Sequence, residues 1–190
     1  MSATGRGAKA ARCLTSRDFE TPKWASVIAG RILCSERCPT GILVDAGCGT
    51  GAIGPVVGAI TQRACVGVEI DSARADKAES RGFFRSVYHA DFLEWAPAYG
   101  ETVGAVVANP PYGKAREFVD AARSLTDGPV CMLLRIGFLA GQKRRDWWQR
   151  NPADVYVLSK RPSFTGAGTD ATDYAWYVWG QGPRGRVSVL

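Results

Sequence analysis

The sequence is poor in histidine, because His89 is the only one in 190 residues. Protein zinc sites are usually built from cysteine and histidine at close spacing. Cys34 and Cys38 are close in sequence, but no second pair and no nearby histidine completes a site. We therefore expect no bound metal. Three of the six cysteines fall in or beside predicted buried strands, where a free thiol packs as a small hydrophobe. This pattern disfavours a disulfide scaffold and fits a reducing cytoplasm.

Long apolar runs are also absent, since no stretch approaches the roughly 20 residues that a membrane-spanning helix needs. The first 17 residues are small, polar and basic, and they lack the apolar centre of a signal peptide. We interpret residues 1–17 as a flexible basic arm. Residues 18–190 are expected to form a single domain, which leaves no room for a separate target-recognition domain.

The chain has a formal charge of +6. A basic balance favours a polyanionic partner such as nucleic acid. Lys143, Arg144 and Arg145 form a basic cluster that could meet phosphate groups, and Lys114 is a further candidate. Solvated surface charge explains such residues equally well, so both interpretations stay open.

Apolar segments with strand character alternate with segments of helical periodicity, which predicts a mostly parallel sheet with helices on both faces. Thr21 and Pro22 are expected to open the first helix, with Thr21 as its cap. The fold class is therefore α/β, with a seven-stranded sheet. The expected strands are residues 42–45, 65–70, 86–91, 104–108, 130–136, 155–158 and 174–179, and the expected helices are 24–33, 52–61, 72–81, 116–125 and 138–149.

A glycine cluster, Asp45 to Gly51, follows the first strand and precedes a helix. Glycine lets the backbone approach a ligand closely, and the N-terminus of the helix lies beyond it. Gly47, Gly49 and Ala52 fit the loose pattern of a dinucleotide-binding turn. A tight turn without a ligand is the alternative.

Acidic residues narrow the type of ligand. Glu69 lies at the end of the second strand and can accept hydrogen bonds from both hydroxyls of a ribose, while Asp91 lies at the end of the third strand and could accept from an adenine amino group. Asp45 can hold an ammonium group, directly or through water. The glycine loop carries no basic side chain for a pyrophosphate. A ligand with ribose, adenine and a cationic amino-acid part therefore fits better than a dinucleotide.

The fourth strand runs into Asn109, Pro110, Pro111 and Tyr112. Proline has no backbone N–H and fixes φ, so the strand cannot continue its ladder there. The turn leaves an amide, carbonyl oxygens and an aromatic ring at the carboxyl edge of the sheet, where open α/β sheets bind ligands. These groups suit a planar amino compound.

Together these motifs resemble the class I S-adenosylmethionine-dependent methyltransferases, which have a Rossmann-like fold. The order of motifs is similar to that of the amino-directed nucleic-acid methyltransferases, and segments 161–166 and 174–176 are similar to the end of small phage and prophage methyltransferases. The resemblance implies S-adenosyl-L-methionine as cofactor and DNA, then RNA, as partner. The cofactor-binding residues it implies are Thr21, Pro22, Asp45, Ala46, Gly47, Cys48, Gly49, Gly51, Glu69, Ile70, Asp91, Phe92 and Asn109.

The resemblance also implies direct in-line methyl transfer to the exocyclic amino group of adenine. Asn109 (side-chain oxygen) and Pro110 (backbone oxygen) would accept the two amino hydrogens, Pro111 would shape the turn, and Tyr112 would stack on the base. A duplex base must leave its stack to reach such a pocket, and Phe164 could form the opposite wall. Phe164 as a core residue is an equal alternative. A protein glutamine methyltransferase and a non-catalytic nucleic-acid-binding protein remain alternative functions.

Overall fold

The computed structural model describes residues 20–164 and 170–190. One sheet of eight strands, in the order β3-β2-β1-β4-β5-β7-β6-β8, organises the described chain. The expected fold class is confirmed, but the sheet has eight strands where the sequence predicts seven. The strands are β1 Ile42–Ala46, β2 Cys65–Glu69, β3 Ser86–His89, β4 Val103–Ala108, β5 Val130–Arg135, β6 Asp154–Val157, β7 Tyr174–Trp179 and β8 Val187–Val189.

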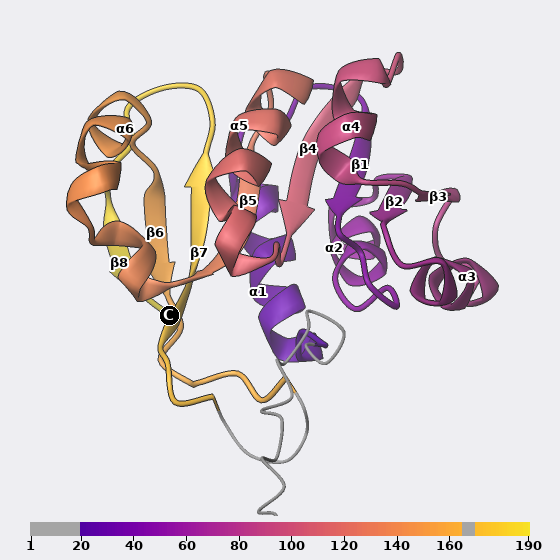
Figure 1. Ribbon diagram of the computed structural model, residues 1–190, viewed down its shortest axis with the longest axis horizontal. Helices are drawn as coiled ribbons and strands as arrows, with labels where there is room; N and C mark the ends of the chain where they lie inside the picture. Colours follow the sequence, from indigo (N-terminus) through magenta and orange to yellow (C-terminus); the bar gives the residue numbers. More distant parts are fainter. Residues whose placement is uncertain (1–19, 165–169) are drawn as a thin grey trace, which may run out of the picture.

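Helices cover both faces of the sheet (Figure 1). Each face of the sheet has its own apolar core. The first core lies under α1 and α2, and the second lies under α4, α5 and α6. Strand pleating explains the separation, since Leu43 packs into the first core while Val44 and Ala46 pack into the second. The helices are α1 Lys23–Ser35, α2 Gly54–Thr61, α3 Ser72–Ser80, α4 Phe92–Trp95, α5 Ala115–Leu125 and α6 Arg145–Arg150, and the 3-10 turns are η2 Ala96–Ala98, η3 Tyr112–Lys114, η4 Ile136–Leu139 and η5 Gln142–Arg144.

Strands β3, β2, β1, β4 and β5 are mutually parallel, and β7 runs antiparallel to both β5 and β6. The carboxyl ends of β1, β2 and β4 therefore meet at one edge near the centre of the sheet, where the strand order reverses on either side of β1. This edge carries the glycine loop after β1 and the Asn-Pro-Pro-Tyr turn after β4. Open α/β sheets bind ligands at such an edge.

The eighth strand, β8, pairs with β6 and is exposed along its length. Its pairing depends on Asp154, which accepts hydrogen bonds from the backbone amides of Gly185 and Arg186 at 3.0 and 2.9 Å. The backbone N–H of Val155 in turn donates to the carbonyl of Arg186. Because the strand is short and its place comes from a distant carboxylate, local periodicity did not reveal it.

Two further expectations are wrong in detail. Residues 138–149 do not form one helix, because Gly141 has φ 117°, and the segment is divided into η4, η5 and the short α6. Thr21 does not cap α1, since the N-cap position is Pro22 and makes no side-chain hydrogen bond. The Thr21 hydroxyl has a different partner, Asn109. In the described part of the chain, no helix combines the length and the apolar character that a bilayer crossing requires.

Candidate active site

A cavity of about 420 Å³ lies at the carboxyl edge of β1, β2 and β4. Its volume falls within the range of about 300–1,000 Å³ that small-molecule sites occupy. All of the predicted catalytic turn lines it, as do most of the predicted cofactor-binding residues. The lining residues are Glu20, Thr21, Gly47, Cys48, Gly49, Thr50, Ala52, Ile53, Val68, Glu69, Ile70, Arg74, Ala90, Asp91, Phe92, Asn109, Pro110, Pro111, Tyr112, Gly113, Lys114 and Phe118.

Glu69 fixes the glycine loop to the end of β2. One carboxylate oxygen accepts a hydrogen bond from the Gly49 amide at 2.8 Å, and the other accepts from the Asp71 amide at 3.0 Å. Gly49 has φ 58°, a conformation that favours glycine. Each carboxylate oxygen can accept more than one hydrogen bond. Glu69 can thus organise the loop and still receive a ligand hydroxyl from the cavity.

Asp45 lies behind this wall. It is fully buried, and one of its oxygens accepts a 2.6 Å hydrogen bond from the Gly54 amide at the start of α2. The other oxygen, Oδ1, has no hydrogen-bond partner among the described residues. Burial raises the pKa of Asp45 to about 7. Asp45, Pro22, Ala46 and Gly51 are predicted cofactor-binding residues that do not line the cavity.

Asp91 and Lys114 form a link across the cavity wall. Asp91 caps α4 by accepting a hydrogen bond from the Leu93 amide at 2.9 Å. Its other oxygen is 3.6 Å from the ammonium nitrogen of Lys114, which follows the Asn-Pro-Pro-Tyr turn. The Lys114 side chain is more than half exposed, so the ion pair adds little stability. It does place a cation from the turn beside the expected adenine end of the cavity.

Asn109 is held by the segment before α1. Its side-chain nitrogen donates to the Thr21 hydroxyl at 3.1 Å. Because the nitrogen of the amide is used in this way, the amide oxygen is the atom that remains to accept from a ligand. The same segment reaches the glycine loop, since Glu20 accepts a hydrogen bond from the Thr50 hydroxyl at 3.0 Å. Residues 20–21 therefore join the two motifs across the cavity.

Tyr112 is the aromatic residue of the turn. The guanidinium of Arg135 lies over its ring, 4.5 Å from the centroid, and the Tyr174 ring lies 5.9 Å away. Burial and then a hydrogen bond with Tyr174 raise the pKa of Tyr112. Its phenol is therefore neutral at ordinary pH, which suits a stacking role better than an ionised one.

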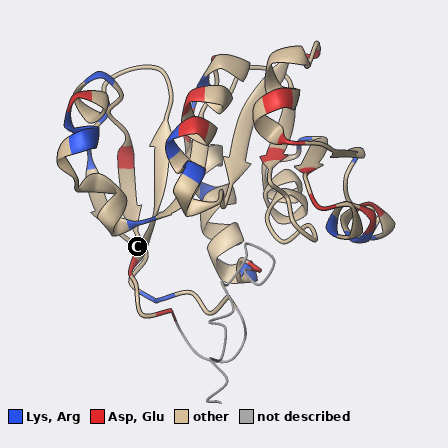
Figure 2. Ribbon diagram, viewed as in Figure 1, with Lys and Arg blue, Asp and Glu red and all other residues tan. Residues whose placement is uncertain are grey.

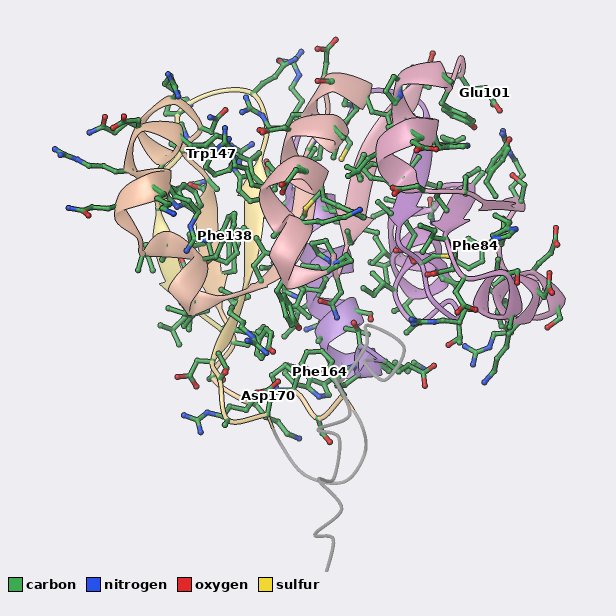
Figure 3. The ribbon with its side chains drawn as sticks, in the orientation of Figure 1. Phe84, Glu101, Phe138, Trp147, Phe164 and Asp170 are labelled. Atoms are coloured by element: carbon green, nitrogen blue, oxygen red, sulfur yellow. The ribbon has the colours of Figure 1, made fainter. Side chains whose placement is uncertain are left out.

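Phe164 does not line the cavity. It is 6% exposed, and its ring meets the edge of Tyr174 at a centroid distance of 5.1 Å. Figure 3 shows Phe164 below the strands, in the same region as Asp170. The placement favours the core interpretation, so we do not assign Phe164 to a base-binding wall. The neighbouring residues 165–169 lie outside the described residues.

The basic cluster Lys143, Arg144 and Arg145 does not line the cavity either. It belongs to η5 and α6, which Figure 2 shows at the end of the sheet beside β6 and β8. The Arg144 guanidinium donates to the Gly137 carbonyl at 3.1 Å and lies over the Phe138 ring. Arg144 thus has a structural role in closing the turn before α6.

Sequence reasoning missed several lining residues, of which Glu20 and Arg74 carry charge. Arg74 comes from the first turn of α3, and its guanidinium lies close to Gly49. The glycine loop itself has no basic side chain, as expected, but a cation reaches it from the next helix. The position of Arg74 about one helical turn after Glu69, at the end of β2, was the feature of the sequence that could have indicated its place in the lining. In the described ranges, no group of histidine, cysteine and acidic side chains has the arrangement of a metal site.

No protein-family model matches the sequence, and no curated protein matches it either. Solved structures do match. A candidate class I S-adenosylmethionine-dependent methyltransferase from Listeria monocytogenes has a TM-score of 0.71 and 12% identity, over 94% of this chain and 68% of that one. A candidate RNA methyltransferase from Pyrococcus horikoshii has a TM-score of 0.65 and 18% identity, over 90% and 91%.

A third match is the modification subunit of a candidate type I restriction enzyme from Vibrio vulnificus, with a TM-score of 0.66 and 14% identity. This chain is covered to 90%, but it spans only 46% of that larger protein. At these identities the likeness establishes the fold, which is the Rossmann-like fold of the class I methyltransferases.

Proposed function

We propose that this protein is an S-adenosylmethionine-dependent methyltransferase that acts on the exocyclic amino group of adenine in nucleic acid, with DNA preferred to RNA. The observation that carries the proposal is the hydrogen bond from the Asn109 side chain to Thr21 at the cavity. It fixes the amide so that its oxygen is the acceptor left for a substrate amino group. The turn is of the type found in the amino-directed adenine methyltransferases.

The cavity fits the proposed cofactor. Carboxylates from Glu20, Glu69 and Asp91 line it together with the cations of Arg74 and Lys114, so a ligand that carries both charges has partners for each. Glu69 would accept from the ribose hydroxyls, and Asp91 with Phe92 and Ile70 would surround the adenine ring. Arg74 beside Gly49 suits the carboxylate of an amino acid. When bound, S-adenosylmethionine supplies a methyl group carried on a positively charged sulfur.

The residues of the turn would prepare the substrate. An adenine amino group is a poor nucleophile, because its lone pair is delocalised into the ring. The Asn109 side-chain oxygen and the Pro110 carbonyl would each accept one amino hydrogen and so favour a pyramidal nitrogen. Tyr112 would stack on the ring and hold its plane. Positioning and charge stabilisation then provide most of the rate enhancement, and the released proton passes to water.

Methyl-labelled S-adenosylmethionine offers the test. The protein and the labelled compound are incubated in three separate reactions with DNA, RNA or a protein extract. Heat-denatured protein serves as the control. We expect label in DNA, with less in RNA. Label in protein alone would refute the proposal in favour of a glutamine methyltransferase. Cofactor binding without any transfer would instead support the non-catalytic alternative.

A further inference from the structure

Arg135, the last residue of β5, was not among the predicted site residues, yet its guanidinium carbon lies 4.5 Å from the centre of the Tyr112 ring. A guanidinium over an aromatic face is attracted by the quadrupole of the ring. Arg135 therefore covers one face of the Tyr112 ring. Tyr112 lines the cavity and Arg135 does not, so we expect a planar ligand to stack on the ring face away from Arg135.

Tyr174, the first residue of β7, ties this pair together. Its hydroxyl accepts a hydrogen bond from Nε of Arg135 at 3.3 Å and donates to a carboxylate oxygen of Asp170 at 2.8 Å. The hydrogen bond between the two tyrosines, after burial, raises the pKa of Tyr112. A phenol has one hydrogen to donate and two lone pairs to accept with, so these contacts use the full capacity of the Tyr174 hydroxyl.

The position of Tyr174 makes this arrangement rigid. The residue is 0% exposed, and its backbone belongs to the β5–β7 ladder, where it pairs with Arg135 itself. Tyr112 therefore packs against the Tyr174 ring, with centroids 5.9 Å apart, and has Arg135 over one ring face. Sites that are fixed in this way before the ligand arrives need less ordering when it binds.

We infer that Arg135 is a positioning residue that sets the plane of Tyr112, and thereby the plane of an aromatic base relative to Asn109. The inference rests on the proposed function and favours its nucleobase substrate over the alternative, a glutamine side chain. A fixed aromatic face benefits a flat ring that can stack across it. The amide of a glutamine side chain has no ring to stack, so the clamp on Tyr112 would contribute much less to its orientation.

The test uses the full chain with Arg135→Met, Arg135→Lys and Tyr174→Phe, and Arg31→Met is the matched control. Arg31 is an exposed arginine of α1 that does not line the cavity. We expect Arg135→Met to lower kcat on the nucleic-acid substrate by about 10- to 100-fold, because small misplacements of reacting groups have effects of this size. Affinity for S-adenosylmethionine and the thermal midpoint should stay near those of the wild type.

Arg135→Lys separates positioning from simple charge. Lysine keeps the charge but lacks the planar group that lies on the ring and donates to Tyr174. We expect Arg135→Lys to remain at least several-fold below wild type in kcat. Tyr174→Phe should also lower kcat. In the double variant with Arg135→Met, the fold-loss in kcat should be smaller than the product of the two single fold-losses.

A second measurement does not depend on turnover. The fluorescence of an oligonucleotide with 2-aminopurine in place of the target adenine is measured at saturating protein. Stacking on Tyr112 quenches this fluorescence, so we expect a lower signal in the complex with the wild type than in the complex with Arg135→Met. If Arg135→Met has the kcat and the quenching of the wild type, or if Arg135→Lys has full kcat, the inference is overturned and the proposed function is unaffected. A wild type that transfers no methyl group to nucleic acid would overturn the proposed function and this inference with it.

Discussion

Asp45, beside the glycine loop near the centre of the sheet, and Asp154, in β6 toward one side of the sheet, are both buried carboxylates with different partners. Asp45 has a backbone amide on one oxygen and, among the described residues, no partner on the other. Asp154 lies within 3.2 Å of Arg184 and 2.8 Å of Arg186. Burial raises the pKa of Asp45 to about 7. For Asp154, burial acts in the same direction, but hydrogen bonds from Arg186 and Arg184 outweigh it and lower the pKa to about 2.

The regions around these two carboxylates also differ in how tightly side chains pack. Around β7, aromatic rings fill the space, as in the stacked Tyr177 and Trp179, 6.0 Å apart. Around the glycine loop, small residues leave a cavity of about 420 Å³. A buried polar group without a partner lowers stability, and such groups concentrate at functional sites. We therefore interpret the glycine-loop region as a binding site and the β6–β8 region as a stabilising part of the fold.

The comparison predicts its largest effect at Asn109. Asn109→Ala should reduce methyl transfer by about 100- to 1,000-fold, the size seen when one stabilising group of an active site is removed. Cofactor affinity and thermal stability should change little, because Asn109 is only partly buried and its hydrogen bond is to Thr21. Radiolabel incorporation and calorimetric binding provide the measurements. Normal transfer by this variant would remove the turn from catalysis.

Asp154→Ala should have the opposite profile. We expect a loss of about 3 kcal/mol in the free energy of unfolding, the lower end for a broken buried ion pair because Glu36 remains beside Arg184. Methyl transfer by the folded fraction should be unchanged. Denaturant unfolding measures the loss, and Asp127→Ala, at an exposed acidic residue, is the control. Equal stability of the two variants would contradict the assigned role of Asp154.

The pH dependence of stability should distinguish the two carboxylates. Asp45 has a folded pKa above its ordinary 3.8, so its contribution is complete below pH 3.8 and is lost as pH rises toward about 7. Asp45→Asn should match wild type near pH 4 and exceed it by about 1–3 kcal/mol at pH 8, since an uncompensated buried charge is removed.

Asp154→Asn should behave in the reverse way. Because the folded pKa of Asp154 is lowered, its contribution is complete above pH 3.8 and is lost as pH falls toward about 2. The deficit of Asp154→Asn relative to wild type should therefore shrink in that acidic window. Unfolding curves at several pH values measure both variants. The same sign of pH dependence for both substitutions would contradict the opposite pKa shifts of the two carboxylates.

Glu69→Gln should produce the smallest effect. Its side chain keeps one acceptor oxygen, so the contact with the Gly49 or Asp71 amide can persist, but a charged acceptor for ribose hydroxyls is lost. We expect cofactor affinity to fall about 10-fold, as for the loss of one charge-assisted hydrogen bond. Calorimetry measures the change, with the exposed Glu79→Gln of α3 as control. Unchanged affinity would exclude Glu69 from the ribose position.

Local patterns predicted most of what surrounds the cavity. The glycine loop, Glu69, Asp91 and the Asn-Pro-Pro-Tyr turn all lie at or just after the ends of strands, and strand ends can be predicted from short apolar runs. The same reasoning failed for Arg74 and Arg135, because their contacts depend on how separate elements pack. The cluster from Lys143 to Arg145 could not be placed relative to the cavity either, since the sequence shows its charge but not the position of α6.

The β6–β8 end was harder to predict for a similar reason. The eighth strand depends on Asp154, which lies 31 residues before Gly185. Residues 138–149 have helical apolar spacing, but Gly141 with φ 117° divides them. For Phe164 the sequence allowed a base-binding wall and a core position equally, and the residue packs against Tyr174. In each case a tertiary contact or a backbone conformation decided the outcome.

The central claim is that the cavity edge and the Asn109 turn together direct methyl transfer to an adenine amino group. Its most direct test is mass spectrometry of nucleosides from DNA and RNA that have been incubated with S-adenosylmethionine and either the wild type or Asn109→Ala. We predict N6-methyladenine with the wild type and its near absence with the variant. Methylation at another atom, or equal N6-methyladenine with both proteins, would contradict the claim.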